Sequence, residues 1–166
     1  MKTFLWLLFF ALFLNTAHAE TRIAVLNFEL KDLTLLPNHP DELKRISSIK
    51  PLLTDELKKY GYSVVSIDET AAQTALMGKG YLFDHADIAA QLGKTVNADY
   101  VIVGRLHKPS FLFAYLLAQV VEVKSGLLID SLTLETKGGE KKLTNKAVEA
   151  LAEKIHNTLI PKIKRQ

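Results

Sequence analysis

The strongest hydrophobic pattern lies between residues 99 and 135, where three apolar runs alternate with a period of two and are joined by two short polar turns. This period is typical of β-strands, because successive side chains of a strand point to opposite faces. The runs predict strands at residues 101–106, 111–123 and 127–136. We expect an antiparallel meander, in which residues 124–126 (KSG) form a tight hairpin turn.

The middle run, residues 111–123, is predicted to be an inner strand and not a membrane helix. It is shorter than the ~20 apolar residues that cross a bilayer, and Gln119 and Glu122 interrupt it. Its first two thirds are apolar on both faces, which predicts layers on both sides and places its aromatic side chains in the core. The small Ala114 and Ala118 predict that a helix packs closely on one face.

Two further strands and four helices are expected in the rest of the chain. The helix signal is apolar spacing of three and four residues. The segment 29–40 is polar and bounded by proline, so we predict a loop into which Leu33, Leu35 and Leu36 fold back. The additional strands are 22–28 and 62–67, and the predicted helices are 46–60, 68–78, 84–92 and 144–163, with Pro161 able to end the last one early.

The start of the first helix has two interpretations because of Pro51. If Ser47 or Ser48 caps the helix, Pro51 falls in the first turn, where its missing N–H has no cost. If the helix begins near Asp41, Pro51 should kink it. Gly61 is expected to end the helix in either case.

The order of elements is βαβααβββα, which predicts a single three-layer α/β domain. Strands one to three alternate with helices and should be parallel, with right-handed crossovers. With the antiparallel meander, the expected mixed five-stranded sheet has the order 2-1-3-4-5 and helices on both faces. Strand five has one wetter face and is therefore predicted at the edge.

The first 19 residues predict a secretory signal peptide. Lys2 precedes a short apolar core, and an Ala-His-Ala sequence places cleavage between Ala19 and Glu20. The sequence contains no cysteine, so no lipoprotein anchor is expected. The prediction is a mature domain at residues 20–166, periplasmic in a bacterium and not inserted in the membrane.

Composition narrows the function classes. Without Lys2 the chain has 20 basic and 18 acidic residues, a balance that is not typical of nucleic-acid binding. The lack of cysteine excludes disulfides and thiol chemistry, so stability must come from the hydrophobic core.

Two segments resemble a known family. Residues 23–30 (IAVLNFEL) and 92–106 (LGKTVNADYVIVGRL) are similar to signatures of the TolB N-terminal domain and of curli-secretion-type periplasmic domains. The closer resemblance is to an uncharacterised exported bacterial family, domain of unknown function 2380, and it covers most of residues 22–160. It implies a TolB-like α/β fold and an envelope accessory role. The genes of some relatives lie near genes for quinoprotein alcohol dehydrogenases. Relatives often carry a cysteine pair where residues 78–87 have none, so no redox role carries over.

Four charged or polar residues form the candidate ligand site. Glu29 and Asp32 follow strand one, and Arg105 and His107 follow strand three. In open α/β sheets, ligands bind at the carboxyl ends of the strands, at the switch point. The alternative interpretation is that these residues form ordinary ion pairs.

Metal and catalytic motifs are weak. The weak metal candidates are His39, with Asp41 and Glu42 beside it, and Asp84, His85 and Asp87, but helix capping is the favoured role of Asp84 and Asp87. We therefore predict no metal and no other cofactor. Nucleophile-elbow, phosphate-loop and zinc-helix motifs are absent, which predicts that the protein is not an enzyme.

Together these observations predict an exported periplasmic accessory or binding protein without catalytic activity. We expect it to act through protein–protein contact in an envelope assembly or a periplasmic oxidation system, with strand 127–136 as the contact surface. The alternative is a small-ligand or metal-binding protein that uses the loops at the carboxyl ends of strands one to three.

Overall fold

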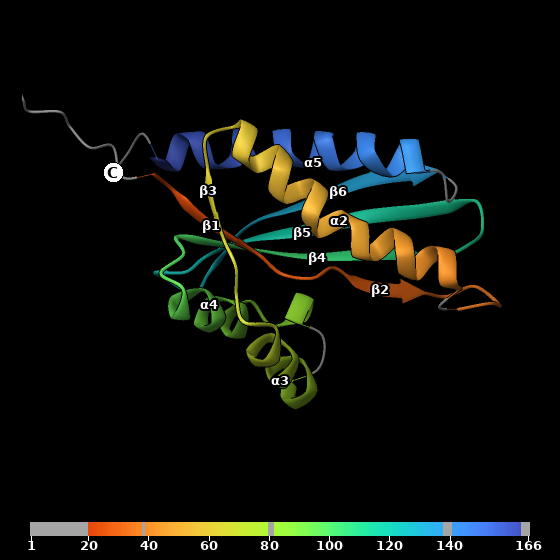
Figure 1. Ribbon diagram of the computed structural model, residues 1–166, viewed down its shortest axis with the longest axis horizontal. Coiled ribbons are helices and arrows are strands. Elements are labelled where there is room, and N and C mark those ends of the chain that lie inside the picture. Colours follow the sequence, from red (N-terminus) through yellow and green to blue (C-terminus); the bar gives the residue numbers. More distant parts are fainter. Residues whose placement is uncertain (1–19, 38, 80–81, 138–140, 164–166) are drawn as a thin grey trace, which may run out of the picture.

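A mixed sheet with helices on both faces is the central feature of the computed structural model, which describes residues 20–163 except 38, 80–81 and 138–140 (Figure 1). The predicted signal peptide, residues 1–19, lies outside the described residues. The strands are β1 (Arg22–Val25), β2 (Glu29–Asp32), β3 (Ser63–Val65), β4 (Tyr100–Lys108), β5 (Phe113–Glu122) and β6 (Leu128–Lys137). The helices are α2 (Pro40–Lys59), α3 (Glu69–Lys79), the 3-10 turn η2 (Leu82–Asp84), α4 (Ala86–Thr95) and α5 (Lys141–Ile163).

The strand order confirms the prediction. The sheet runs β3-β1-β4-β5-β6, with β1 parallel to β3 and β4, and with β4, β5 and β6 as an antiparallel meander. The edge position of β6 is therefore confirmed. Gly126 has a φ of 72°, as the predicted tight turn between β5 and β6 requires.

The predicted first strand, residues 22–28, is wrong in its extent. It is divided into β1 and β2, and both pair in parallel with β4, so Glu29–Asp32 is a strand and not a loop. Val25 lies opposite Ile102 and Glu29 lies opposite Arg105, a step of four residues against three. The extra residue reverses the alternation of side chains between β1 and β2, as in a β-bulge.

The larger core lies under α2 and α5, which pack side by side on one face of the sheet (Figure 1). Ala114 and Ala118 of β5 are buried in it, which confirms that small residues there receive a helix. The largest fully buried aliphatic side chains of the two helices are Ile49, Leu53, Leu57, Leu151, Ile155 and Leu159.

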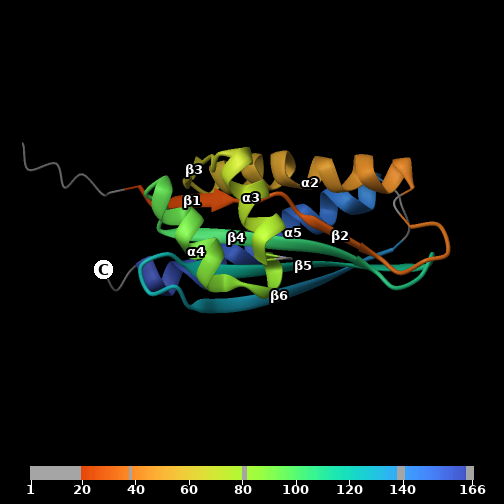
Figure 2. The same cartoon turned by 90° about the horizontal axis from the view of Figure 1, so that it is seen from below.

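The second core lies under α3, η2 and α4 on the opposite face and covers only part of the sheet. Figure 2 shows these helices over one half of the strands on this face, and none of them over the half where β5 begins. Val121 and Val123 are buried there, but Phe113 is 44% exposed. The prediction that the first two thirds of this strand are buried on both faces is therefore wrong, because the covering layer ends before that part.

The helix boundaries settle the alternatives for Pro51. Helix α2 begins at Pro40, so Pro51 lies inside it, and Ser47 and Ser48 donate hydrogen bonds to carbonyls of the preceding turn. Gly61 follows the helix with a φ of 84°, as expected. At the other end of the chain, α5 continues through Pro161 to Ile163.

Candidate functional site

The four predicted ligand residues lie on two opposite faces of the sheet. Glu29 is opposite Arg105 and Asp32 is opposite Lys108 in the pairing of β2 with β4. Because side chains alternate along a strand, the first pair points toward α3 and α4, and the second toward α2 and α5. The structure thus brings Glu29 and Arg105 together but separates them from Asp32.

Arg105 is the buried centre of an ion cluster on the α3/α4 side, in which the side chain of Glu29 is 9% exposed and that of Asp84 is 59% exposed. Its Nη2 lies 3.0 Å from Glu29 Oε2 and 2.9 Å from Asp84 Oδ2, and its guanidinium carbon lies 4.4 Å from the centroid of the Phe83 ring. Burial lowers the pKa of Arg105, but the hydrogen bonds to Asp84 and Glu29 outweigh it and leave that pKa above its ordinary value. The cluster fastens η2 to the sheet.

The histidine and aspartate candidates for a metal do not converge. His39 caps α2, where its Nδ1 accepts from Asp41 N at 3.4 Å, whereas His85 precedes α4 on the other face. The predicted cap role of Asp84 is wrong, because His85 holds the N-cap position and Asp84 binds Arg105. Within the described part of the chain, no group of three His, Cys, Asp or Glu side chains could hold a metal ion.

His107 points to the same face as Arg105 but takes no part in its cluster. Its ring lies 6.5 Å from the ring of Tyr115 on β5, and its Nδ1 is buried without a hydrogen-bond partner in the described structure. The stacking places His107 on the uncovered half of the sheet.

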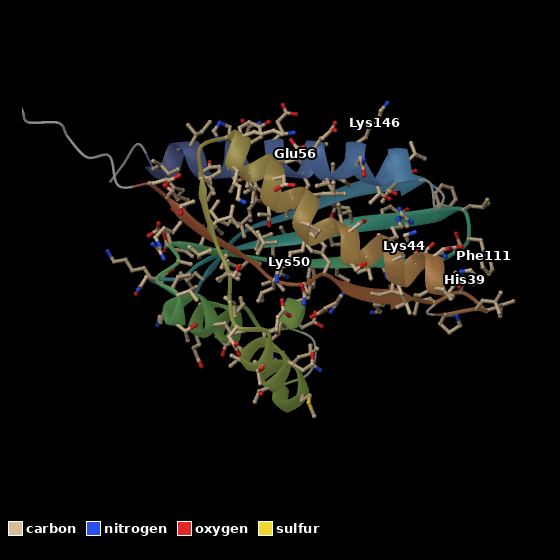
Figure 3. The ribbon with its side chains drawn as sticks, viewed as in Figure 1. His39, Lys44, Lys50, Glu56, Phe111 and Lys146 are labelled. Atoms are coloured by element: carbon tan, nitrogen blue, oxygen red, sulfur yellow. The ribbon has the colours of Figure 1, made fainter. Side chains whose placement is uncertain are left out.

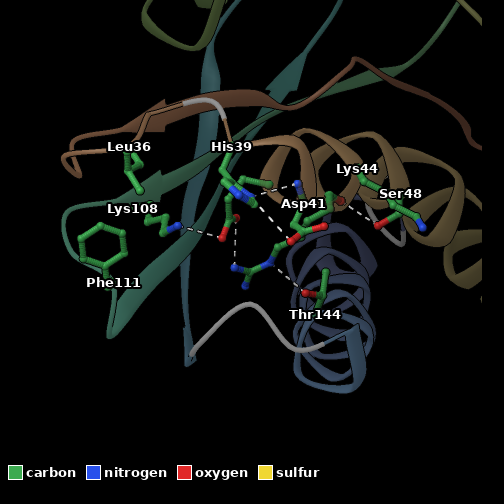
Figure 4. Close-up of a pocket in the computed structure, with 10 residues that line it drawn as sticks. Leu36, His39, Asp41, Lys44, Ser48, Lys108, Phe111 and Thr144 are labelled. Atoms are coloured by element: carbon green, nitrogen blue, oxygen red, sulfur yellow. Dashed lines mark hydrogen bonds and ion pairs between the residues drawn. The ribbon is translucent and has the colours of Figure 1, made fainter.

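A cleft of about 690 Å³ lies on the α2 side, at the carboxyl ends of β2 and β4 (Figure 4). This end of the sheet is where the sequence predicts a ligand site, although the residues differ. The cleft is lined by Leu36, His39, Asp41, Glu42, Lys44, Arg45, Ser48, Lys108, Phe111 and Thr144.

The floor of the cleft is a network of buried charges centred on Glu42. Glu42 Oε1 accepts from Lys108 Nζ at 2.8 Å, and Oε2 lies 3.4 Å from Arg45 Nη1. Arg45 also donates to the hydroxyls of Thr144, at 2.9 Å, and Thr136. Asp32 Oδ2 lies 3.9 Å from Lys108 Nζ. The network joins α2, β4, β6 and α5. Its charged groups are paired with one another.

Sequence reasoning missed Arg45 and placed Glu42 only in a loop cluster with His39 and Asp41, although a signal for their buried positions exists. The buried stripe of α2 runs through Ile49, Leu53 and Leu57. At helical spacing, the same stripe continues toward the N-terminus of α2 through positions 45 and 42. Charged residues on the buried face of a helix indicate a paired, buried cluster.

The rim of the cleft belongs to an exposed apolar surface, here called the apolar tip. Its side chains are 57–90% exposed, and they come from the loop after β2 and the turn between β4 and β5. The first loop is tied to the last residue of β4, where the turn begins, by a hydrogen bond of 2.9 Å from Leu33 N to Lys108 O. The predicted folding back of the three leucines is therefore wrong. The apolar tip consists of Leu33, Leu35, Leu36, Phe111 and Leu112.

Comparison with known families places this fold and cleft in context. Residues 21–155 match the sequence profile of a family described as "protein of unknown function (DUF2380)". The chain belongs to this family. The predicted family resemblance is thus confirmed, and the DUF2380 profile extends from β1 into α5.

Solved structures confirm the fold of this DUF2380 domain. PelC from Paraburkholderia phytofirmans, solved as a dodecamer, superposes with a TM-score of 0.54 at 15% identity, over 84% of this chain and 87% of PelC. TolB from Acinetobacter baumannii has a TM-score of 0.53 at 13% identity, over 86% of this chain and 29% of TolB. No functionally curated protein matches significantly in sequence. In the described residues, no helix has the length and apolar character that a bilayer span requires.

Proposed function

We propose that this DUF2380 protein is exported to the periplasm and acts without catalysis, by binding another protein of an envelope assembly or a periplasmic oxidation system. The apolar tip is the observation that supports this function. It places five large apolar side chains at one end of the molecule, on two loops, the first of which is tied to the end of β4 by a backbone hydrogen bond. An exposed apolar cluster of this kind is more often a binding surface than a surface that stays free of partners.

The chemistry around the apolar tip also favours contact over catalysis. The nearby charges of Glu42, Arg45 and Lys108 bind one another and are buried. A general acid or base must instead reach a substrate proton. In the described residues no serine or threonine hydroxyl is hydrogen-bonded to a histidine, an arrangement on which nucleophilic catalysis relies.

The test is a triple variant, Leu35→Ser, Leu36→Ser and Phe111→Ser, compared with the parent in the native host. We expect crosslinking in the periplasm to yield a defined adduct with the parent and at least tenfold less adduct with the triple variant. The control is Met77→Ser with Leu127→Ser, because these side chains are equally exposed but lie outside the apolar tip. Equal adduct yields from parent and triple variant would contradict the proposal. N-terminal sequencing of the periplasmic protein should give Glu20 as the first residue.

A second candidate function is the binding of a small ligand in the cleft. Its volume of about 690 Å³ and its place at the carboxyl ends of β2 and β4 support this alternative. A thermal-shift panel of metabolites separates the two functions. A saturable rise in Tm that is lost in Ser48→Trp, which fills the cleft, would favour the ligand, and no shift would exclude it.

A further inference from the structure

We propose that the free edge of β6 and the groove between β6 and α5 bind an extended peptide segment of a partner protein as an additional strand. This inference rests on the proposed function, namely that the protein works by protein contact, and it names the segment that is recognised. It concerns a different surface from the apolar tip.

The backbone of β6 offers hydrogen-bonding groups on its outer side. In the described chain β6 pairs with β5 and with no other strand. The amide of Ser131 donates to its neighbour Asp130 at 2.8 Å, so this amide points away from β5. Backbone groups of an antiparallel strand alternate in direction. The N–H and C=O groups of Thr133 and Glu135 therefore point outward as well, where a partner strand could bind them.

A groove runs beside this free segment and gives side chains of the added strand a place to pack. It measures about 450 Å³ and lies between β6 and α5. Its α5 wall includes Ala147 and Ala150, which are three residues apart and so lie on one face of the helix. These small side chains allow a strand to lie close to α5. The groove is lined by Leu134, Glu135, Thr136, Leu143, Lys146, Ala147 and Ala150.

The groove indicates the chemistry of the peptide. Its apolar wall formed by Leu134, Leu143 and the two alanines fits apolar side chains at alternate positions of an added strand. Lys146 projects from α5 at the rim of the groove (Figure 3) and is exposed. An acidic side chain or a C-terminal carboxylate of the peptide would complement this lysine.

The size of the surface favours a peptide over a second copy of the chain. Asp130 already occupies the amide of Ser131, so the free segment is short and centres on residues 132–136. A stable dimer buries about 800 Å² per partner, which a strand contact of this length does not reach. An extended peptide instead combines main-chain hydrogen bonds with a few side-chain pockets, as in β-strand addition.

The experiment is selection of a displayed random-peptide library on the mature chain, followed by fluorescence anisotropy with the enriched peptides. We expect extended sequences with alternating apolar residues and an acidic residue or an acidic end. Thr133→Pro, which removes an outward N–H, and Ala150→Glu, which fills the groove and adds negative charge, should each weaken binding at least tenfold. Thr133→Val keeps the N–H, and Glu149→Ala alters α5 beside the groove, so both controls should bind within twofold of the parent.

The outcomes separate this inference from the proposed function. No enriched peptide, or peptides that bind Thr133→Pro and Ala150→Glu as tightly as the parent, would overturn it, provided that urea unfolding shows both variants folded. A dimer in solution that both variants dissociate would also overturn it, because the occupant would be a second copy. The apolar-tip triple variant should bind the peptides normally. If that variant loses the periplasmic adduct and the peptide selection also fails, the proposed function is supported and the inference about the β6 edge is overturned.

Discussion

Gly104 shows why the segment 92–106 has a recognisable sequence. It lies on β4 beneath Phe28, and a Cβ at this position would lie 2.0 Å from Phe28 Cε1. Gly93 is similarly placed, since its Cβ would lie 2.5 Å from Val101 Cγ2. Both glycines permit close packing on opposite faces of β4. Two glycines of this segment therefore serve close packing against neighbouring side chains.

Replacement of Gly104 by alanine should destabilise the protein by about 1–3 kcal/mol, because the added methyl group overpacks the core against the Phe28 ring. Urea unfolding measures this free energy. Gly78→Ala is the matched control, since a Cβ there meets no atom within 4 Å and α3 should gain about 0.5–1 kcal/mol. Phe28→Leu in the Gly104→Ala background should restore part of the loss. An unchanged free energy of unfolding for Gly104→Ala would contradict this account.

Tyr62 predicts a particular response to alkaline pH. Its side chain is buried beneath α5, its hydroxyl lies 2.9 Å from His156 Nδ1, and burial raises the pKa of the phenol to about 12. Between pH 10 and pH 12 the unfolded chain loses this proton while the folded chain keeps it. Stability present below pH 10 is therefore lost as the pH rises, with a slope of up to about 1.4 kcal/mol per pH unit.

The check is urea unfolding of the parent and of Tyr62→Phe between pH 9 and pH 11. Tyr62→Phe should be less stable at pH 9, because it loses the contact with His156. Its stability should then fall less steeply above pH 10 than that of the parent. Parallel curves for the two proteins would show that Tyr62 does not titrate differently in the folded and unfolded states.

At the scale of elements, β2 shows why the sequence of a strand can predict a loop. Its sequence ELKD carries three charges in four residues, which predicts no strand. In the register with β4, however, Glu29 meets Arg105 and Asp32 meets Lys108, one pair on each face. The charges are compatible with burial because each finds its counter-charge on the neighbouring strand. Complementary charge over 76 residues of sequence separation is visible only once the register is known.

Glu42 joins α2 to this strand pair, and its removal should cost more than the removal of any exposed acid of the same helix. Glu42→Gln deprives the buried Lys108 and Arg45 of a shared carboxylate, which we expect to destabilise the protein by about 2–4 kcal/mol. Asp41→Asn is the control, since the Asp41 side chain is 90% exposed and the loss of its charge should change stability by less than about 1 kcal/mol. Urea unfolding at pH 7 compares the two. If both variants lose the same free energy of unfolding, the buried network stabilises the protein no more than an exposed charge does.

At the scale of the whole molecule, the sequence predicted the order of the sheet and the family but not which apolar residues are exposed. Alternation and helical spacing are local signals, and they sufficed to place β4, β5, β6 and the helices in order. Leu35 and Phe111 were expected in the core because they are apolar. Their exposure depends on how far α2 and α3 extend over the sheet, which no local pattern encodes. The sequence predicted a ligand site at the carboxyl ends of the strands, but none of its four residues lines the cleft that the structure has there.

The uneven cover of the sheet also predicts where the molecule opens first. Helix α3 has no fully buried side chain among residues 69–78, whereas α5 buries a continuous stripe that ends with Leu159. Local opening costs little free energy where few apolar contacts are lost. In native-state hydrogen exchange, amides of α3 should exchange through local opening. Amides of β4, β5 and α5 should exchange only as the whole molecule unfolds.

Two variants distinguish local from global opening in that measurement. Ala75→Gly, in the middle of α3, should speed exchange there by about fivefold, as expected for about 1 kcal/mol of helix propensity, and should speed the slowest amides by a similar factor, because global unfolding also melts α3. Leu53→Ala removes a fully buried side chain of α2 and should speed the slowest amides of β4 and α5 by at least 30-fold, as expected for a loss above 2 kcal/mol. Because α3 opens by itself, its amides should hardly respond to Leu53→Ala. If Leu53→Ala speeds the amides of α3 as much as those of β4 and α5, the two faces of the sheet unfold as one unit.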